Sequence, residues 1–215
     1  RKLRYQGRID DMEKPSKTPT SYDTRDAINA LLNNQQIANP TTKVFGCSVK
    51  WAEKEELVKQ SNEKWALQPV TLDSITEDGI KQLLKNDSDK LRLINIWATW
   101  CGPCVAEFDD FVIINRMYRS RDFEFISISA DDPAAKDKVL KFLKKKHAAN
   151  TNYLFNIDNK YKLIEAVDPN WQGGLPYTIL VEPGGKIVYA KQGAIDPAKM
   201  KTLIVDNAMI GRFYK

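Results

Sequence analysis

Two cysteines, Cys101 and Cys104, stand at a junction between an apolar run and a helical pattern, and this junction limits the folds open to the chain. Residues 91–96, Leu-Arg-Leu-Ile-Asn-Ile, are typical of a buried strand, and residues 105–119 are typical of an amphipathic helix. The cysteines are therefore expected in the first turn of a helix. There the free backbone N–H groups and the positive end of the helix dipole stabilise an anion, so the Cys101 thiol should ionise more readily than that of a free cysteine.

The spacing of the two cysteines indicates their chemistry. Cys104 lies within one helical turn of Cys101 and can close a disulfide onto it, which makes the pair a reversible two-electron couple. Zinc binding is one alternative, but zinc needs two more ligands and the chain offers only Cys47 and its single histidine, His147. A purely structural disulfide is another, although a bridge that closes so short a loop restricts the unfolded chain little. The strand before the pair and the helix after it favour a redox role.

The length and composition fit a globular protein with one domain and an appendage, or with two small domains. The chain has 215 residues, of which 42% are hydrophobic and 28% charged, and its net charge is +5. The lysine run at residues 144–146 lies on a helical pattern with an apolar opposite face, so we interpret it as a solvated face rather than a nucleic-acid site. No apolar stretch approaches the roughly 20 residues of a membrane span. Because the chain opens with Arg1 and no signal-peptide pattern, we expect an excised or processed piece of a longer protein.

Residues 1–64 are expected to form an N-terminal extension. Residues 3–9 could form a strand, and the apolar positions of residues 27–32 repeat at the spacing of a short helix that Asp23 or Thr24 could cap. One strand and one helix bury little apolar surface by themselves. This region should therefore pack on the rest of the chain or be the tail of a preceding domain, and we favour the tail.

Strands and helices alternate regularly from residue 65 onward. The Pro-Gly-Gly turn at residues 183–185 joins the last two strands into a hairpin. Strands separated by helices indicate a largely parallel sheet covered on both faces, with the antiparallel hairpin at one side. The expected order is βαβαβα followed by ββα, with a short strand and a helix through residues 80–84 before it. The expected strands are residues 70–72, 91–96, 123–129, 153–155, 177–181 and 186–189, and the later helices are residues 105–119, 132–148, 160–167 and 196–211.

Two motifs in this region carry a resemblance to a known family. Residues 97–108 read Trp-Ala-Thr-Trp-Cys-Gly-Pro-Cys-Val-Ala-Glu-Phe, and residues 174–181 read Gly-Leu-Pro-Tyr-Thr-Ile-Leu-Val. With Gly-Lys-Ile-Val at residues 185–188, they resemble the TlpA/ResA-like thiol:disulfide oxidoreductases of the redoxin family. The resemblance covers residues 65–215. It implies an α/β thioredoxin fold, a central mixed sheet flanked by helices, here with an N-terminal extension.

The resemblance also implies the catalytic residues. Cys101 would attack a substrate disulfide, and Cys104 would then resolve the mixed disulfide. Thioredoxins proper keep a buried aspartate six residues before the first cysteine, where this chain has Asn95. The ResA-like branch instead has a glutamate three residues after the second cysteine, here Glu107, which can accept the proton of the resolving thiol and return it to the leaving thiolate. The alternative for Glu107 is to complement the helix dipole.

A second group of residues is expected to contact the substrate. The resemblance implies a cis Leu175–Pro176 peptide against the disulfide, with the backbone of Leu175 free to pair with a substrate strand. The alternative for Pro176 is an ordinary proline at the start of a strand. The residues between the cysteines match the reducing thioredoxin type. Trp97, Trp100 and Trp171 are expected to form an apolar docking surface, with core packing as the alternative for Trp97. The expected substrate-binding residues are Trp100, Gly102, Pro103, Leu175 and Pro176.

The implied function is reduction of protein disulfides, with no cofactor, no metal and no nucleic acid. The partners would be a protein disulfide substrate and an upstream electron-donor thiol protein, in the periplasm or cell envelope of a bacterium. The first 50 or so residues weakly resemble the tail of a peroxiredoxin-like redoxin domain. Cys47 would then be a buried apolar residue or a thiol that relays electrons between domains. In the most specific version of the second alternative, Cys47 pairs with Cys101 in an oxidised intermediate.

Two other functions stay open. One is a non-catalytic binding module that uses the same fold with inert cysteines, and the other is a partner domain of a thiol peroxidase. Peroxide reduction by this domain itself is disfavoured, because that chemistry normally needs a threonine two residues further from the reactive cysteine than Thr99 is, together with an arginine in the site.

Overall fold

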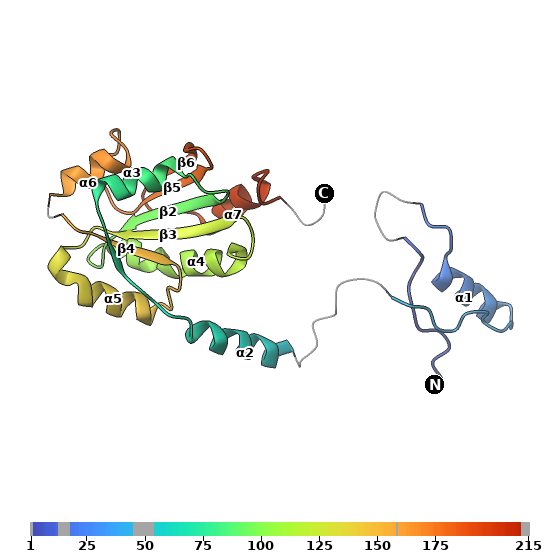
Figure 1. The fold of residues 1–215 in the computed structure, drawn as a ribbon. Helices are drawn as coiled ribbons and strands as arrows, with labels where there is room; N and C mark the ends of the chain where they lie inside the picture. The colour runs from blue at the N-terminus through green and yellow to red at the C-terminus, as the bar shows by residue number, and fades with distance from the viewer. Residues whose placement is uncertain (1, 13–17, 45–53, 158, 212–215) are drawn as a thin grey trace. The chain divides into compact units, whose positions relative to one another are not determined.

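The structure, a computed structural model, describes residues 2–12, 18–44, 54–157 and 159–211 (Figure 1). The chain divides into two compact units, Arg1–Leu57 and Val58–Lys215. Their boundary falls inside the helix α2 (Lys54–Ala66). The boundary expected between residues 64 and 65 stays a prediction. None of the helices in the described part of the chain combines the length and apolarity needed to cross a membrane.

The first unit has little core of its own. Its helix α1 (Asp23–Leu32) confirms the expected helix, and Ala27 is the one buried apolar residue among the described residues of this unit. The expected cap is wrong, because Asp23 accepts a hydrogen bond from Arg8 Nε at 2.8 Å and no side chain caps the helix. The strand expected at residues 3–9 is also wrong. Within the described residues, this segment forms a single bridge between Gln6 and Thr41 and no strand. The segment around Cys47 lies outside the described residues.

The second unit is built on one six-stranded mixed sheet. Its strand order is β1-β4-β3-β2-β5-β6, in which β1, β4, β3 and β2 are parallel and β5 and β6 are antiparallel to their neighbours. This confirms the expected parallel sheet with a hairpin at one side. The strands are β1 (Asp73–Ile75), β2 (Leu91–Trp97), β3 (Phe123–Ser129), β4 (Thr151–Phe155), β5 (Tyr177–Glu182) and β6 (Lys186–Gln192).

Helices cover both faces of this sheet, as expected for an α/β fold. Figure 1 shows α3 and α6 on one face and α4 and α5 on the other. The α4 face carries two apolar clusters, one of which includes side chains of α7, and the α3 face carries one. The helices are α3 (Glu77–Lys85), α4 (Gly102–Tyr118), α5 (Lys136–Lys145), α6 (Lys160–Val167) and α7 (Pro197–Asp206), with a short 3-10 helix η1 (Pro133–Ala135) before α5.

Several expectations for this unit are corrected. The last helix ends at Asp206 rather than near residue 211, because the backbone of Asn207 is extended. The first strand lies at Asp73–Ile75 rather than residues 70–72, because only the later residues pair with β4. Helix α2 was not expected, since most of its residues are exposed and Trp65 is the buried one. The helix expected at residues 132–148 is split and shorter. Asp132 caps η1 by accepting from Ala134 N at 2.8 Å, and α5 ends at Lys145.

A row of buried polar side chains crosses the α4 face of the sheet between its two apolar clusters. Asn95 of β2 lies opposite Thr178 of β5 and Ser127 of β3, and Ser127 lies opposite Asn152 of β4. Asn95 Nδ2 donates to Thr178 Oγ1 at 3.0 Å, and Ser127 Oγ donates to Asn152 Oδ1 at 2.8 Å. All four side chains are almost completely buried. The row therefore places polar groups in the core directly beneath α4.

We predict that Asn152→Ala destabilises the protein strongly. Its amide donates to the carbonyls of Thr71, Ala148 and Asn150 and accepts from Ser127, so the substitution leaves several buried groups without partners. Each such group costs roughly 1–3 kcal/mol, and we expect the free energy of unfolding to fall by about 3 kcal/mol in urea denaturation.

The matched control is Asn156→Ala at an exposed position, which should change the unfolding free energy by less than about 0.5 kcal/mol. Equal effects of the two substitutions would show that the buried row contributes no special stability.

Candidate redox site

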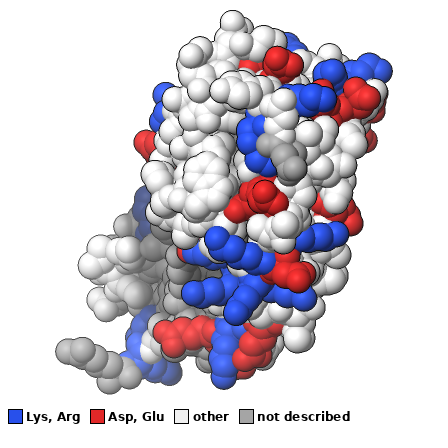
Figure 2. Space-filling view, turned by 90° about the vertical axis from the view of Figure 1, so that its left-hand side faces the viewer, with Lys and Arg blue, Asp and Glu red and all other residues white. Residues whose placement is uncertain are grey.

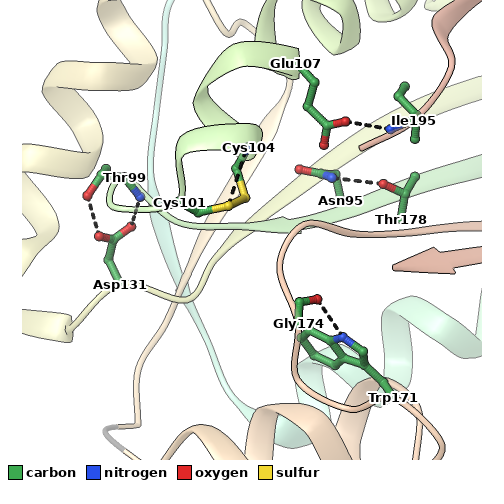
Figure 3. Close-up of a disulfide and its surroundings, with 10 residues drawn as sticks. All are labelled: Asn95, Thr99, Cys101, Cys104, Glu107, Asp131, Trp171, Gly174, Thr178 and Ile195. Atoms are coloured by element: carbon green, nitrogen blue, oxygen red, sulfur yellow. Dashed lines mark hydrogen bonds between the residues drawn. A yellow bond between two sulfur atoms is a disulfide. The ribbon is translucent and has the colours of Figure 1, made fainter. Parts of the chain in front are cut away.

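The two cysteines form a disulfide at the start of α4 (Figure 3). Their S–S distance is 1.99 Å and their Cα atoms are 5.3 Å apart. Cys101 is the N-cap residue of the helix, and its Sγ accepts a hydrogen bond from the backbone N–H of Cys104 at 3.3 Å. A backbone N–H in the first turn of α4 therefore points at the sulfur that we expect to become a thiolate. Among the described residues, no three His, Cys, Asp or Glu side chains are grouped to hold a metal ion.

A buried carboxylate fixes the loop that leads to Cys101. Asp131 follows β3 and is 2% exposed. Its Oδ2 accepts from Thr99 N at 2.8 Å and from Ser129 Oγ at 2.7 Å, and its Oδ1 accepts from Thr99 Oγ1 at 2.5 Å. Sequence reasoning missed this residue. The available signal was its place directly after the strand beside β2, because the carboxyl ends of neighbouring parallel strands meet at one edge of a sheet.

The carboxyl group of Glu107 lies over the buried polar row. Its Oε2 accepts from Ile195 N at 2.8 Å, whereas its Oε1 has no hydrogen-bond partner. Figure 3 shows this carboxyl beside the Asn95 amide, one helical turn beyond Cys104. Burial raises the pKa of Glu107 to about 7, against the opposing effects of the Ile195 N–H and Asn95. At neutral pH the group is therefore divided between its protonated and ionised forms.

The loop before β5 faces the disulfide. Its Leu175–Pro176 peptide bond is cis, with Pro176 buried and Leu175 half-buried. Trp171 holds the loop, because its Nε1 donates to the Gly174 carbonyl at 2.9 Å and its ring stacks on Tyr177 at 4.8 Å between centroids. In Figure 3 the segment from Trp171 to Gly174 lies across from the start of α4. The structure thus brings the expected substrate-binding segment to the cysteine pair.

The three tryptophans have different environments. Trp100 is 67% exposed, as a docking residue should be, and it directly precedes Cys101. Trp97 is 0% exposed, and its ring packs against Phe108 and Phe142 at 4.7 and 4.9 Å between centroids. The docking role is therefore wrong for Trp97, and its alternative, core packing, is confirmed. Trp171 is largely buried and shapes the loop rather than the outer surface.

A mixed sheet covered on both faces, with a disulfide at the first turn of the helix after the central strand, defines a thioredoxin-fold domain with a CxxC redox site. A family model described as Redoxin matches residues 60–204, and the chain belongs to the redoxin family. The expected α/β thioredoxin fold is thereby confirmed.

The chain is similar to several named proteins. The chain is 28% identical over 102 residues to the thiol-disulfide oxidoreductase ResA of Bacillus subtilis, covering 47% of this chain and 52% of ResA. It is 26% identical over 147 residues to the thiol:disulfide interchange protein CycY of Rhizobium leguminosarum bv. viciae, covering 65% of this chain and 66% of CycY. A solved thioredoxin-family thiol:disulfide interchange protein from Chlorobium tepidum TLS is 23% identical, with a TM-score of 0.48, covering 67% of this chain and 98% of that chain. The chain therefore spans about half to two thirds of the two curated relatives. The family and the cysteine pair support a CxxC thiol:disulfide oxidoreductase.

The raised pKa of Glu107 predicts a pH-dependent stability. Since the folded-state pKa is about 7 and the unfolded value is 4.5, the folded protein binds the proton more tightly, and stability falls as pH rises from about 4.5 to 7. Glu107→Gln resembles the protonated form and removes this loss. We expect the variant to gain up to about 3 kcal/mol relative to wild type between pH 5 and pH 8, in urea denaturation of the oxidised proteins. Parallel pH profiles of the two proteins would contradict the raised pKa.

Proposed function

We propose that this domain is a dithiol–disulfide exchange enzyme that reduces disulfides in protein substrates. The observation that supports it best is the Cys101–Cys104 disulfide at the helix N-terminus, with Leu175, the residue before the cis Pro176, packed against the apolar cluster that contains both cysteines. The named relatives, a thiol-disulfide oxidoreductase and a thiol:disulfide interchange protein, support the same activity.

The proposed reaction starts from the reduced pair. The Cys101 thiolate attacks one sulfur of the substrate disulfide, a mixed disulfide forms, and the other substrate sulfur leaves as a thiolate that takes up a proton. The Cys104 thiolate then attacks the Cys101 sulfur and releases the second substrate thiol. Two electrons pass to the substrate, and the protein is left with the disulfide present in the structure. An upstream thiol protein would reduce this bond again.

Glu107 is proposed to serve the resolving step. Cys104 is 1% exposed, so solvent has little access to its proton. Glu107 lies one turn further along the same helix, and its pKa of about 7 suits a group that accepts a thiol proton and returns it to the leaving thiolate. Its Oε1, which has no protein partner, is the oxygen available for this exchange.

The substrate is proposed to bind along the exposed edge of the site. Trp100, Gly102 and Pro103 are exposed around the disulfide. The backbone of Leu175, next to Pro176, would pair with an extended segment of the substrate, as peptides do at exposed strand edges. The residues between the cysteines favour the reducing direction.

The cellular setting is proposed from the family. Thiol-disulfide oxidoreductases act on protein substrates and exchange electrons with thiol partners, and we place this one in a bacterial cell envelope. Residues 1–50 are proposed to be the tail of a preceding redoxin domain, and the role of Cys47 stays open between a buried apolar residue and a thiol that relays electrons.

Insulin reduction by dithiothreitol tests the exchange reaction. Wild type should accelerate insulin precipitation, and Cys101→Ser should reduce the rate to that of dithiothreitol alone, because the attacking sulfur is lost. Cys104→Ser should instead accumulate a mixed disulfide that mass spectrometry detects. Ala106→Ser, at an exposed position of the same helix, is the matched control and should keep full activity. A wild-type chain with no activity would favour a non-catalytic binding module.

Glu107→Gln tests the proton transfer. We expect resolution of a preformed mixed disulfide on Cys101 to slow about 100-fold at neutral pH, since general acid–base catalysis contributes about that much. The pH profile should also lose the step that belongs to the carboxyl. Asp109→Asn removes an exposed carboxylate of α4 and should leave both unchanged. Unchanged thiol pKa values and rates in Glu107→Gln would remove Glu107 from the mechanism.

A further inference from the structure

A pocket of about 290 Å³ opens beside the disulfide. Trp100, the residue before Cys101, forms one part of its wall, and Leu175, the residue before Pro176, forms another. Helix α6, the segment around Trp171 and two residues that follow β3, Ala130 and Asp132, supply the rest. The pocket is therefore continuous with the surface on which the proposed function places the substrate.

The interior of this pocket is apolar. Leu163, Ala130 and Trp171 are between 1% and 6% exposed, and Ile164 is half-buried beside them. Such a lining favours an apolar occupant, because removing apolar surface from water is favourable and a charged group buried there would lose its hydration. The volume lies at the lower end of the roughly 300–1,000 Å³ of small-molecule sites, so it suits a single side chain better than a larger ligand.

The wall of the pocket combines an aromatic ring with charges of both signs, the ammonium of Lys160 and the exposed carboxylate of Asp132. The Trp100 indole is exposed on one side. Lys160 lies on another, where its Nζ donates to the carbonyls of Asp131 at 3.0 Å and Ile157 at 3.3 Å. These two bonds fix the ammonium at the wall. An aromatic ring can contact an indole edge to face and a cation through its face, so these groups favour an aromatic occupant over an aliphatic one.

The face of the molecule that carries α6 has a large area without charge. Figure 2 looks onto the side of the molecule where α6 lies in Figure 1. It shows a broad area without charged side chains, and Lys, Arg, Asp and Glu side chains of both signs lie interspersed elsewhere on this face. No single sign of charge dominates the view, so recognition here depends on apolar contacts rather than on long-range attraction.

We propose that this pocket binds an aromatic side chain of the protein substrate, within two residues of the cysteine that Cys101 attacks. The inference rests on the proposed function and adds a substrate class to it. An extended segment paired with the backbone of Leu175 points alternate side chains to one side, and the pocket lies where such a side chain would enter. Substrates with Phe, Tyr or Trp near the reactive cysteine are then reduced faster than others.

The test uses the reduced chain, separated from small thiols, and short peptide dimers joined by one disulfide. In each peptide, either Phe or Ala occupies one of the two positions before or the two positions after the cysteine. The second-order rate constant for release of thiol from the peptide dimer by the reduced chain is measured. We expect the Phe peptide to react about tenfold faster than the Ala peptide at one of these positions, as a filled apolar pocket allows. Equal rates at every position overturn the proposal.

A second peptide separates aromatic from merely apolar recognition. Cyclohexylalanine has nearly the shape of Phe but no π face, so it should react several times more slowly than Phe at the preferred position. Equal rates for these two peptides overturn the aromatic assignment. If the reduced chain reduces neither peptide faster than dithiothreitol does, the proposed function is wrong and this inference fails with it. That outcome differs from equal rates for two peptides that the chain does reduce.

Variants then locate the effect in the pocket. Lys160→Met and Ile164→Ala should each lower the ratio of Phe to Ala rates several-fold, because one removes the cation and the other widens the pocket. The matched control is Tyr161→Ala on the same helix, whose side chain is 77% exposed and does not line the pocket, and its ratio should equal that of wild type. A wild-type ratio in both pocket variants, with α-helical circular dichroism intact, would place the preference elsewhere and overturn the proposal.

Discussion

The hydrogen bonds of Asp131 to Thr99 determine where the disulfide lies. Strands β2 and β3 run parallel in register up to Trp97 and Ser129, and the chain must leave both strands at the same edge of the sheet. There the Asp131 carboxylate accepts from the backbone N–H and the hydroxyl of Thr99, which fixes the turn that places Cys101 at the N-cap of α4. The dipole and the free N–H groups of a helix act only over its first turn, so a shift of this turn would remove the sulfur from their influence. The reactivity proposed for the site therefore depends on a contact between the ends of two strands.

The core beneath α4 contains buried polar side chains next to Glu107, the residue to which the mechanism assigns proton transfer. Asn95, Thr178 and Ser127 are buried, and each has a hydrogen-bond partner in the same row, which offsets the cost of taking these groups out of water. Glu107 differs, because one of its carboxylate oxygens has a partner and the other has none. An ionised carboxylate with an unpaired buried oxygen is unfavourable, and this is the physical cause of its raised pKa. The incomplete hydrogen bonding lies next to the cysteine pair, where a group that must gain and lose a proton would be.

The parts of the fold that could be predicted are those with a strong local pattern. Strands β2 and β3 are rich in apolar residues, and the Pro-Gly-Gly turn marks the hairpin. Strands β2, β3 and β5 were therefore predicted to within one residue, whereas β6 runs three residues beyond its predicted end. The CxxC pair was predictable because strand, cysteines and helix are adjacent in sequence. Helix α2 and the position of β1 were not, since an exposed charged helix has little apolar periodicity and a three-residue strand depends on its partner. Asp131 and Asn152 were missed because their roles come from contacts between distant strands. Trp97 and Trp100 show the same limit, since sequence gives the residue type but not which of two near neighbours faces outward.

The oxidised structure also bears on how the reduced site would work. In the disulfide state the two sulfurs carry no charge, and the pKa of about 7 for Glu107 belongs to this state. Reduction under the proposed mechanism places a thiolate at Cys101, on the same helix as the carboxyl, and a nearby negative charge raises the pKa of a carboxyl further. Glu107 would then hold its proton while Cys101 is ionised and would become more acidic once the mixed disulfide removes that charge. Because two such groups titrate as a coupled pair, the proton would move in step with the charge on the attacking sulfur. Under the proposed mechanism, burial of a single carboxyl would thus link the protonation of the resolving cysteine to the progress of the exchange.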